Sequence, residues 1–193
     1  MSLFFIICIV LLFALFCWLA LYITILFFDS KAFRRSPTVT SSSKSIKVMT
    51  QYIRKYNEDV LKKTDLKILD IGSGYGRLLF KMNKLLNNPN NIFVGYEISK
   101  LSYKISVFLN KYKNVYLINN DIKNLYDDDF DFVISFMLKK QQKELINVYK
   151  KFKKGTIIVV NSNAIPFGEN DGYKKIDTLR VGFGWDVFIY IKN

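Results

Sequence analysis

The stretch Leu66–Phe80 contains three glycines at alternate positions, set between two runs of aliphatic side chains. Residues 67–71, before the glycines, have the length and apolar content of a buried strand, and the residues after them have helical spacing. Gly72, Gly74 and Gly76 have no Cβ, so the backbone there can bend sharply and let a ligand approach the amides at the helix start. The pattern predicts an α/β fold with a nucleotide-binding turn after its first strand.

The chain beyond residue 44 alternates between short apolar runs and helical patterns. Apolar residues spaced three and four apart predict an amphipathic helix over residues 46–60, capped by the serines that precede it. Continuous apolar strands alternating with helices indicate a parallel sheet covered on both faces, and two strands joined directly near the end indicate an antiparallel border. The expected strands are 67–71, 91–97, 114–121, 131–135, 155–161, 176–181 and 186–191, and the expected helices between them are 78–86, 100–110 and 141–152.

Two familiar nucleotide loops do not fit the glycines. The dinucleotide fingerprint would place a glycine at position 77, where this chain has Arg77, and a Walker loop would need Gly-Lys followed by Ser or Thr. The order hydrophobic-Asp70-x-Gly-x-Gly-x-Gly instead resembles that of the class I methyltransferases, which use S-adenosylmethionine (SAM). The resemblance implies an α/β fold with a seven-stranded Rossmann-like sheet, mostly parallel with antiparallel C-terminal strands. A tight strand-to-helix turn without a ligand is the alternative.

Acidic residues at the ends of the next two expected strands agree with this resemblance. Glu97 stands where a carboxylate can accept both ribose hydroxyls of the cofactor, and Asp121 where one can take the adenine amino group. Ile122 would then pack on the adenine ring. An Asp at a strand end is also often only a helix cap, so that reading of Asp121 stays open. The expected cofactor-binding residues are Asp70, Gly72, Ser73, Gly74, Gly76, Glu97, Ile98, Asp121 and Ile122.

The sequence defines the methyl-acceptor side of the site less closely. Ser135 and Asn161 end the fourth and fifth expected strands, where substrates of this fold meet the methyl group, so both are candidates for catalysis. Either could instead be a strand-end hydrogen bonder, and no residue is identified as the base. The chain has no histidine, and Cys8 and Cys17 lie in an apolar N-terminal segment. This excludes Ser-His or Cys-His catalysis and a His-ligated metal, and we expect no metal site.

That N-terminal segment, residues 3–28, contains no charged residue, proline or glycine. As a helix it would be roughly 39 Å long, enough to cross a bilayer. A cleaved signal peptide or a buried core helix are the alternatives, but the segment lacks a basic start. We therefore expect a transmembrane helix in residues 1–30, a linker in 31–43 and a methyltransferase domain in 44–193. Basic residues after the helix predict a single-pass protein with its catalytic domain on the cytoplasmic, or topologically equivalent, side.

The formal net charge of +13 has three interpretations. It could attract anionic lipid headgroups, it could attract nucleic acid, or it could reflect a lysine-rich composition whose side chains simply solvate the surface. Together with the apolar helix, the charge favours a membrane as partner over nucleic acid.

The anchor, the sequence from Asp70 to Arg77 and Gly95-Tyr-Glu97 also resemble a narrower group. These are the small membrane-anchored protein-lysine methyltransferases that modify the ATP synthase c subunit and the adenine nucleotide translocase, and their prokaryotic relatives. This resemblance implies methyl transfer to a lysine amine of a membrane-associated protein. Alternative acceptors are a lipid, a quinone or RNA. Tyr75 stands where this group usually has an acidic residue, which keeps open a non-catalytic, membrane-tethered protein of the same fold.

Overall fold

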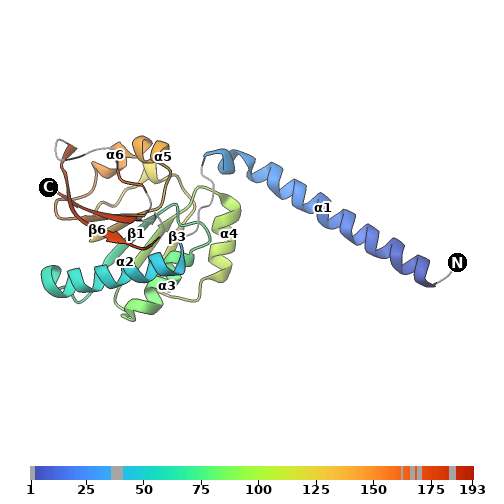
Figure 1. Ribbon diagram of the computed structural model, residues 1–193, viewed down its shortest axis with the longest axis horizontal. Coiled ribbons are helices and arrows are strands. Elements are labelled where there is room, and N and C mark those ends of the chain that lie inside the picture. Colours follow the sequence, from blue (N-terminus) through green and yellow to red (C-terminus); the bar gives the residue numbers. More distant parts are fainter. Residues whose placement is uncertain (1–2, 36–40, 162, 166–167, 169–170, 183–185) are drawn as a thin grey trace. The chain divides into compact units, whose positions relative to one another are not determined.

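The computed structural model describes residues 3–35, 41–161, 163–165, 168, 171–182 and 186–193 (Figure 1). The chain forms two units, Met1–Pro37 and Thr38–Asn193. The first consists of one helix and the second of a sheet with its covering helices, and each is described by itself.

The first unit is helix α1, Leu3–Arg35. It continues through residues 31–35, where the sequence predicts a linker, because no proline or glycine interrupts the chain before Pro37. Phe5–Thr24 within it is long and apolar enough to span a membrane, judged by length and composition alone. Of the other residues of the predicted linker, 36–40 lie outside the described part of the chain, and Ser43 already begins the next helix.

The second unit contains a seven-stranded sheet of order β3-β2-β1-β4-β5-β7-β6, which confirms the expected mixed, Rossmann-like architecture. Strands β1 to β5 are parallel, whereas β7 lies antiparallel between β5 and β6. The third strand is shorter than the 114–121 expected and ends well before Asp121. The strands are β1 Lys67–Ile71, β2 Ile92–Tyr96, β3 Val115–Ile118, β4 Phe132–Ser135, β5 Ile157–Asn161, β6 Tyr173–Arg180 and β7 Asp186–Lys192.

The helices of this unit are α2 Ser43–Tyr56, α3 Arg77–Leu86, α4 Lys100–Leu109, α5 Lys139–Glu144 and α6 Ile146–Tyr149. Ser42 caps α2, as expected from the serines before it, because its side chain accepts a hydrogen bond from the Ser45 amide at 3.0 Å. Two expectations about helices are wrong. Val60 does not lie on the buried face, because the chain passes into a wider π-helical turn at Asn57–Leu61, which changes the helical phase and leaves Val60 exposed.

The other wrong expectation is a continuous helix over 141–152. The chain instead forms α5 and α6, which are separated at Leu145. Leu145 leaves the helical conformation (φ −94°, ψ 4°), yet its side chain stays buried in the core. The break therefore preserves the apolar contact while it ends the first helix.

Apolar clusters cover both faces of the sheet. On one face α2 and α3 pack against inward residues of the central strands, among them Ile68, Phe132 and Ile157. On the other face α6 and its flanking residues pack against Leu69, Val133 and Ile158. Successive side chains of β1, β4 and β5 point to opposite faces of the sheet. Because both faces are covered, these strands are buried on both sides, as expected of parallel strands.

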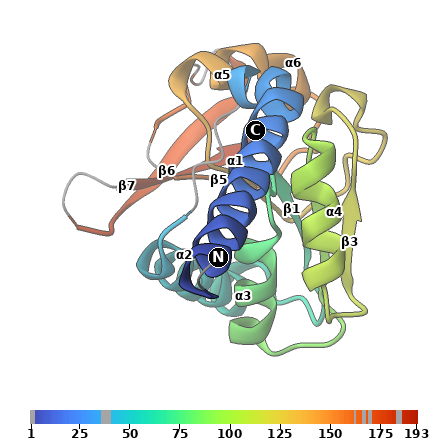
Figure 2. The same cartoon turned by 90° about the vertical axis from the view of Figure 1, so that its right-hand side faces the viewer.

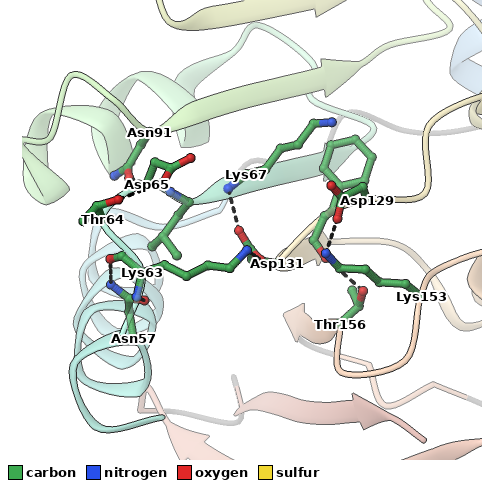
Figure 3. Close-up of polar contacts among 12 residues, drawn as sticks. Asn57, Lys63, Thr64, Asp65, Lys67, Asn91, Asp129, Asp131, Lys153 and Thr156 are labelled. Carbon is green, nitrogen blue, oxygen red and sulfur yellow. Dashed lines mark hydrogen bonds and ion pairs between the residues drawn. The ribbon is translucent and has the colours of Figure 1, made fainter. Parts of the chain in front are cut away.

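Ion pairs and a hydrogen bond connect the amino ends of the central strands (Figure 3). Asp131, just before β4, accepts a hydrogen bond from the Lys67 amide at 2.9 Å and forms a 2.7 Å salt bridge with the Lys63 ammonium. Lys153 and Asp129 form a second, more exposed pair nearby. The contacts of Asp131 join the start of β1 to the start of β4, and the Lys153–Asp129 pair joins the segments that precede β5 and β4. Both lie at the end of the sheet opposite the glycines.

Candidate cofactor site

The glycine loop lies at the carboxyl end of β1 and curls over the end of β2. Gly72, Gly74 and Gly76 all have positive φ angles, of 75°, 55° and 77°, which side chains with a Cβ rarely adopt. The Tyr96 carbonyl accepts hydrogen bonds from the amides of Gly72 and Ser73, each at 2.9 Å. These two hydrogen bonds fix the loop to its neighbouring strand.

A second close approach explains why β2 contains a glycine. A Cβ placed on Gly95 would lie 2.8 Å from both the Cβ and the Oγ of Ser73, and 2.9 Å from a methyl group of Leu79. Gly95 is also the neighbour of Asp70 in the parallel β1–β2 register. The glycine loop can pack this tightly on β2 only because position 95 has no side chain. From the sequence, Gly95 was noted only as part of a family resemblance, and its contact with the glycine loop was not predicted.

Glu97 connects the glycine loop to the start of α4. Its Oε2 atom accepts a hydrogen bond from the Gly74 amide at 2.7 Å, and its Oε1 atom accepts one from the Ser99 amide, also at 2.7 Å. Both bonds are short, as expected when the acceptor is charged. The sequence placed Glu97 in the site but missed Ser99, which also caps α4 through its hydroxyl.

Asp70 is almost completely buried at the end of β1. Burial, and then repulsion from the nearby Glu97 carboxylate, raises the pKa of Asp70 from 3.8 to about 7. The two carboxylates therefore act on one another at the same end of the sheet. A cationic ligand placed beside them would relieve this repulsion and favour the ionised form of Asp70.

The other expected cofactor residues have more ordinary roles in the structure. Asp121 caps a short 3₁₀ turn, because its Oδ1 atom accepts a hydrogen bond from the Lys123 amide at 2.9 Å. Ile122 is buried in the core cluster, whereas Ile98 is exposed. Contact of any of these three with a cofactor stays a prediction.

Ser135, at the end of β4, belongs to a buried hydrogen-bond network. The Gln142 side-chain amide donates to the Ser135 hydroxyl at 3.3 Å, and the Tyr149 hydroxyl donates to the Gln142 Oε1 atom at 2.7 Å. Burial raises the pKa of Tyr149 well above its ordinary value. The network ties α5 and α6 to β4, which favours a positioning role for Ser135.

Asn161, at the end of β5, has a different environment. Its Nδ2 atom donates to the Ser41 hydroxyl at 3.3 Å, while its buried Oδ1 atom has no hydrogen-bond partner among the described residues. Arg77 donates to the Ser41 carbonyl at 3.2 Å and to the Ser43 hydroxyl at 3.0 Å. The segment before α2 is thereby held beside the glycine loop and β5, a contact that the sequence did not reveal.

The chemistry of these groups can be matched to a class of ligand. The buried Ser73 hydroxyl has no hydrogen-bond partner among the described residues, and Asp70 and Glu97 together favour positive charge. Tyr75, the unusual loop residue, is 39 % exposed and so lies at the surface of the loop. The site fits a ligand that carries both hydroxyl groups and positive charge, and SAM, with its ribose, ammonium and sulfonium, is such a molecule.

Comparison with known proteins gives the family. The family model of a methyltransferase domain matches residues 62–173, which include the glycine loop, Glu97 and the first five strands. No protein of curated function matches the chain by sequence.

Solved structures share the fold. An RNA methyltransferase from Salinibacter ruber, in complex with S-adenosyl-L-homocysteine, has a TM-score of 0.64 and 16 % identity, over 80 % of this chain and 94 % of that one. A ribosomal protein L11 methylase from Lactobacillus delbrueckii subsp. bulgaricus has a TM-score of 0.55 and 17 % identity, over 74 % and 78 % of the two chains. The plantazolicin methyltransferase BpumL, in complex with SAH, has a TM-score of 0.53 and 21 % identity, over 69 % of this chain and 51 % of its own length.

Proposed function

This chain belongs to the methyltransferase-domain family, and from that premise we propose that it binds SAM and transfers its methyl group to an amine. The observation that carries the proposal is the hydrogen bond between the glycine loop and the Glu97 carboxylate, beside the buried Asp70. The S-adenosylhomocysteine in neighbours of the same fold agrees with this choice of cofactor.

Specific residues would hold the cofactor. Gly72, Gly74 and Gly76 leave room for close approach, and Glu97 would accept from the ribose hydroxyls while it keeps the loop in place. Asp70 would balance the positive charge of the ligand. Ser73, Ile98, Asp121 and Ile122 complete the proposed site. When bound, SAM supplies a methyl group on a sulfonium, which is already an activated electrophile.

The chain must then orient the acceptor and favour its uncharged form. A free lysine amine has a pKa of about 10.4, so removal from water is one way to favour loss of its proton. Asn161 is the better candidate for orienting an amine, because its Oδ1 atom is an acceptor without a partner among the described residues. Ser135 already serves the Gln142 network. Orientation of this kind lowers the barrier once the amine has lost its proton.

We infer that the acceptor is a lysine of a membrane-associated protein. Support comes from the apolar segment Phe5–Thr24, from the basic residues that follow it and from the resemblance to membrane-anchored lysine methyltransferases. An anchor holds enzyme and substrate in one plane and raises their effective concentration. RNA is the second candidate, because the net charge is +13.

Calorimetric titration of the full chain in lipid nanodiscs with SAM tests the cofactor proposal. Wild type should give saturable binding, and Gly74→Val should weaken it by about 5- to 150-fold, because a β-branched residue at φ 55° is strained. Gly168→Ala is the matched control, since a Cβ there meets nothing within 4 Å. Equal affinity in wild type and Gly74→Val would overturn the proposed pocket.

A second experiment identifies the acceptor. Tritiated methyl-SAM is incubated with the full chain and a membrane extract, and the label is sorted into protease-sensitive, solvent-extractable and RNase-sensitive fractions. Protease-sensitive label that yields methyl-lysine on hydrolysis supports the proposal. Label in either of the other fractions would replace lysine by a lipid-like or an RNA acceptor.

A further inference from the structure

Helix α4 buries polar residues and exposes apolar ones, which is the reverse of an ordinary surface helix. Its buried residues are Ser102 and Ser106, whereas Leu101, Ile105 and Phe108 are exposed, Phe108 to 87 %. Helices that cover a sheet usually turn their apolar stripe toward the core and their polar residues toward water. Here small hydroxyl side chains face the interior, and large apolar ones face outward.

The exposed apolar residues of α4 form one continuous stripe. Leu101, Ile105 and Phe108 are four and three positions apart, so they lie on one side of the helix, and Leu109 extends the stripe. None of these residues belongs to either of the two core clusters of the described chain. α4 lies along β3 at the edge of the sheet, where Tyr116 is also exposed (Figure 2). The described residues of the second unit therefore leave this stripe uncovered.

The charged residues of the chain segment that carries this stripe have a single sign. Residues 98–120 contain no Asp or Glu, and four lysines, all exposed, lie within them: Lys100, Lys104, Lys111 and Lys113. Lys100 and Lys104 are four positions apart on α4 and border the stripe. An apolar stripe bordered by lysines is the pattern of helices that lie in a membrane interface.

We propose that α4 docks on an anionic lipid bilayer. Leu101, Ile105 and Phe108 enter the boundary between headgroups and acyl chains, and Lys100 and Lys104 contact lipid phosphates. The charge of residues 98–120 complements an anionic surface. Because α4 begins at the Ser99 contact with Glu97, docking also fixes the direction in which the candidate cofactor site faces the membrane. The proposed contact uses residues of α4 alone, and none of them has a part in the proposed methyl-transfer chemistry.

Fluorescence depth quenching on the full chain tests the proposal. Cys8 and Cys17 are first replaced by serine, and a single cysteine is introduced by Phe108→Cys and labelled with the dye NBD. Val60→Cys, at an exposed apolar position of the second unit, is the control site. Both proteins are reconstituted in phosphatidylcholine vesicles with and without phosphatidylglycerol, each containing doxyl-labelled lipid. Doxyl lipid should quench the dye at position 108 in anionic vesicles, and leave the dye at position 60 unquenched.

Reversing the charges of two lysines on α4 distinguishes docking of α4 from membrane attachment through α1. Lys100→Glu with Lys104→Glu should remove most of the quenching at position 108, since each lost lysine weakens contact with an anionic surface roughly fivefold. Lys140→Glu with Lys143→Glu on α5 makes the same change in net charge and should retain it. Equal quenching at positions 60 and 108 would overturn the proposal. So would a shielded but unquenched dye at 108, which would mean that α1 or a second copy covers the stripe. Neither outcome depends on SAM binding or methyl transfer.

Discussion

Asp131 lies at the amino end of the central strands and Asp70 at their carboxyl end, and both are buried acids of one sheet. Asp131 accepts a hydrogen bond from the Lys67 amide and pairs with Lys63. Asp70 forms no salt bridge among the described residues, and its acidic neighbour Glu97 helps to raise its pKa. Groups of the chain itself thus compensate the negative charge of Asp131 at the amino end, whereas the two carboxylates at the carboxyl end favour a cationic ligand.

The difference between these ends separates stability from binding. Removing the partner of a buried carboxylate is costly to the fold, while a carboxylate held beside another acid destabilises the fold until a cation arrives. Perturbed acids of the second kind concentrate at functional sites.

The largest effect should come from pH acting on Asp70. Its pKa is 3.8 in the unfolded chain and about 7 in the fold, so the unfolded chain ionises first as pH rises. The free energy of unfolding should therefore fall between about pH 4 and about pH 7, by up to about 4 kcal/mol. The chain has no histidine to mask this titration.

Chemical denaturation at several pH values measures the effect, and Asp70→Asn should flatten the profile. In wild type, SAM affinity should rise over the same range, because a cationic ligand favours ionised Asp70. If Asp70→Asn left the pH dependence of the free energy of unfolding unchanged, Asp70 would be ionised throughout this pH range.

Gly95→Val should come next, with a loss of about 3 kcal/mol, because its Cβ would enter space held by Ser73 and Leu79. The glycine loop would have to move, so SAM binding should be lost together with stability. Thermal unfolding with and without SAM measures both losses. A stable variant with normal SAM affinity would contradict the proposed dependence of the loop on β2.

Asp131→Ala should cost about 2 kcal/mol, because it leaves the Lys67 amide without its acceptor and Lys63 without its partner. SAM affinity should stay within about twofold of wild type, which corresponds to only about 0.4 kcal/mol. Denaturant titration and calorimetry measure the two quantities. A large loss of affinity would mean that the two ends of the sheet are coupled.

The smallest effect should come from Asp129→Asn, which breaks an exposed ion pair with Lys153. Exposed pairs contribute about 0.2–1 kcal/mol and are screened by salt. Denaturant titration at low and high salt should therefore show a small difference that salt removes. A loss as large as that of Asp131→Ala would place both pairs in one network.

Local patterns were enough to predict most elements of the domain and the glycine loop. β1 was predicted at the residues where it occurs, because a short apolar run followed by glycines permits little else. Glu97 was assigned to the cofactor site from the family resemblance, and that role stays a prediction, although the Glu97 carboxylate does accept a hydrogen bond from the Gly74 amide. The strands and helices themselves depend on residues that are near one another in sequence.

The features that were missed depend on side-chain geometry or on a local change of helix type. Arg77 reaches Ser41, and Ser135 joins Gln142 and Tyr149, through side-chain geometry that no spacing rule contains. The π-helical turn after Tyr56 changed which side of the chain is buried, although the apolar spacing through Val60 was regular. Periodicity predicts that a helix has a stripe, but not what the stripe faces, and α4 is the clearest example.

The position of β7 between β5 and β6 has a consequence for biosynthesis. All residues of β5 are buried in the finished domain, yet one edge of β5 stays open until residue 186 and those after it have left the ribosome. During that interval the nascent chain presents an unpaired apolar strand, which is prone to pairing with other chains. A chain released after Arg180 should therefore sediment as aggregate while the longer chain stays dispersed, and a dispersed short chain would show that β5 is protected in some other way.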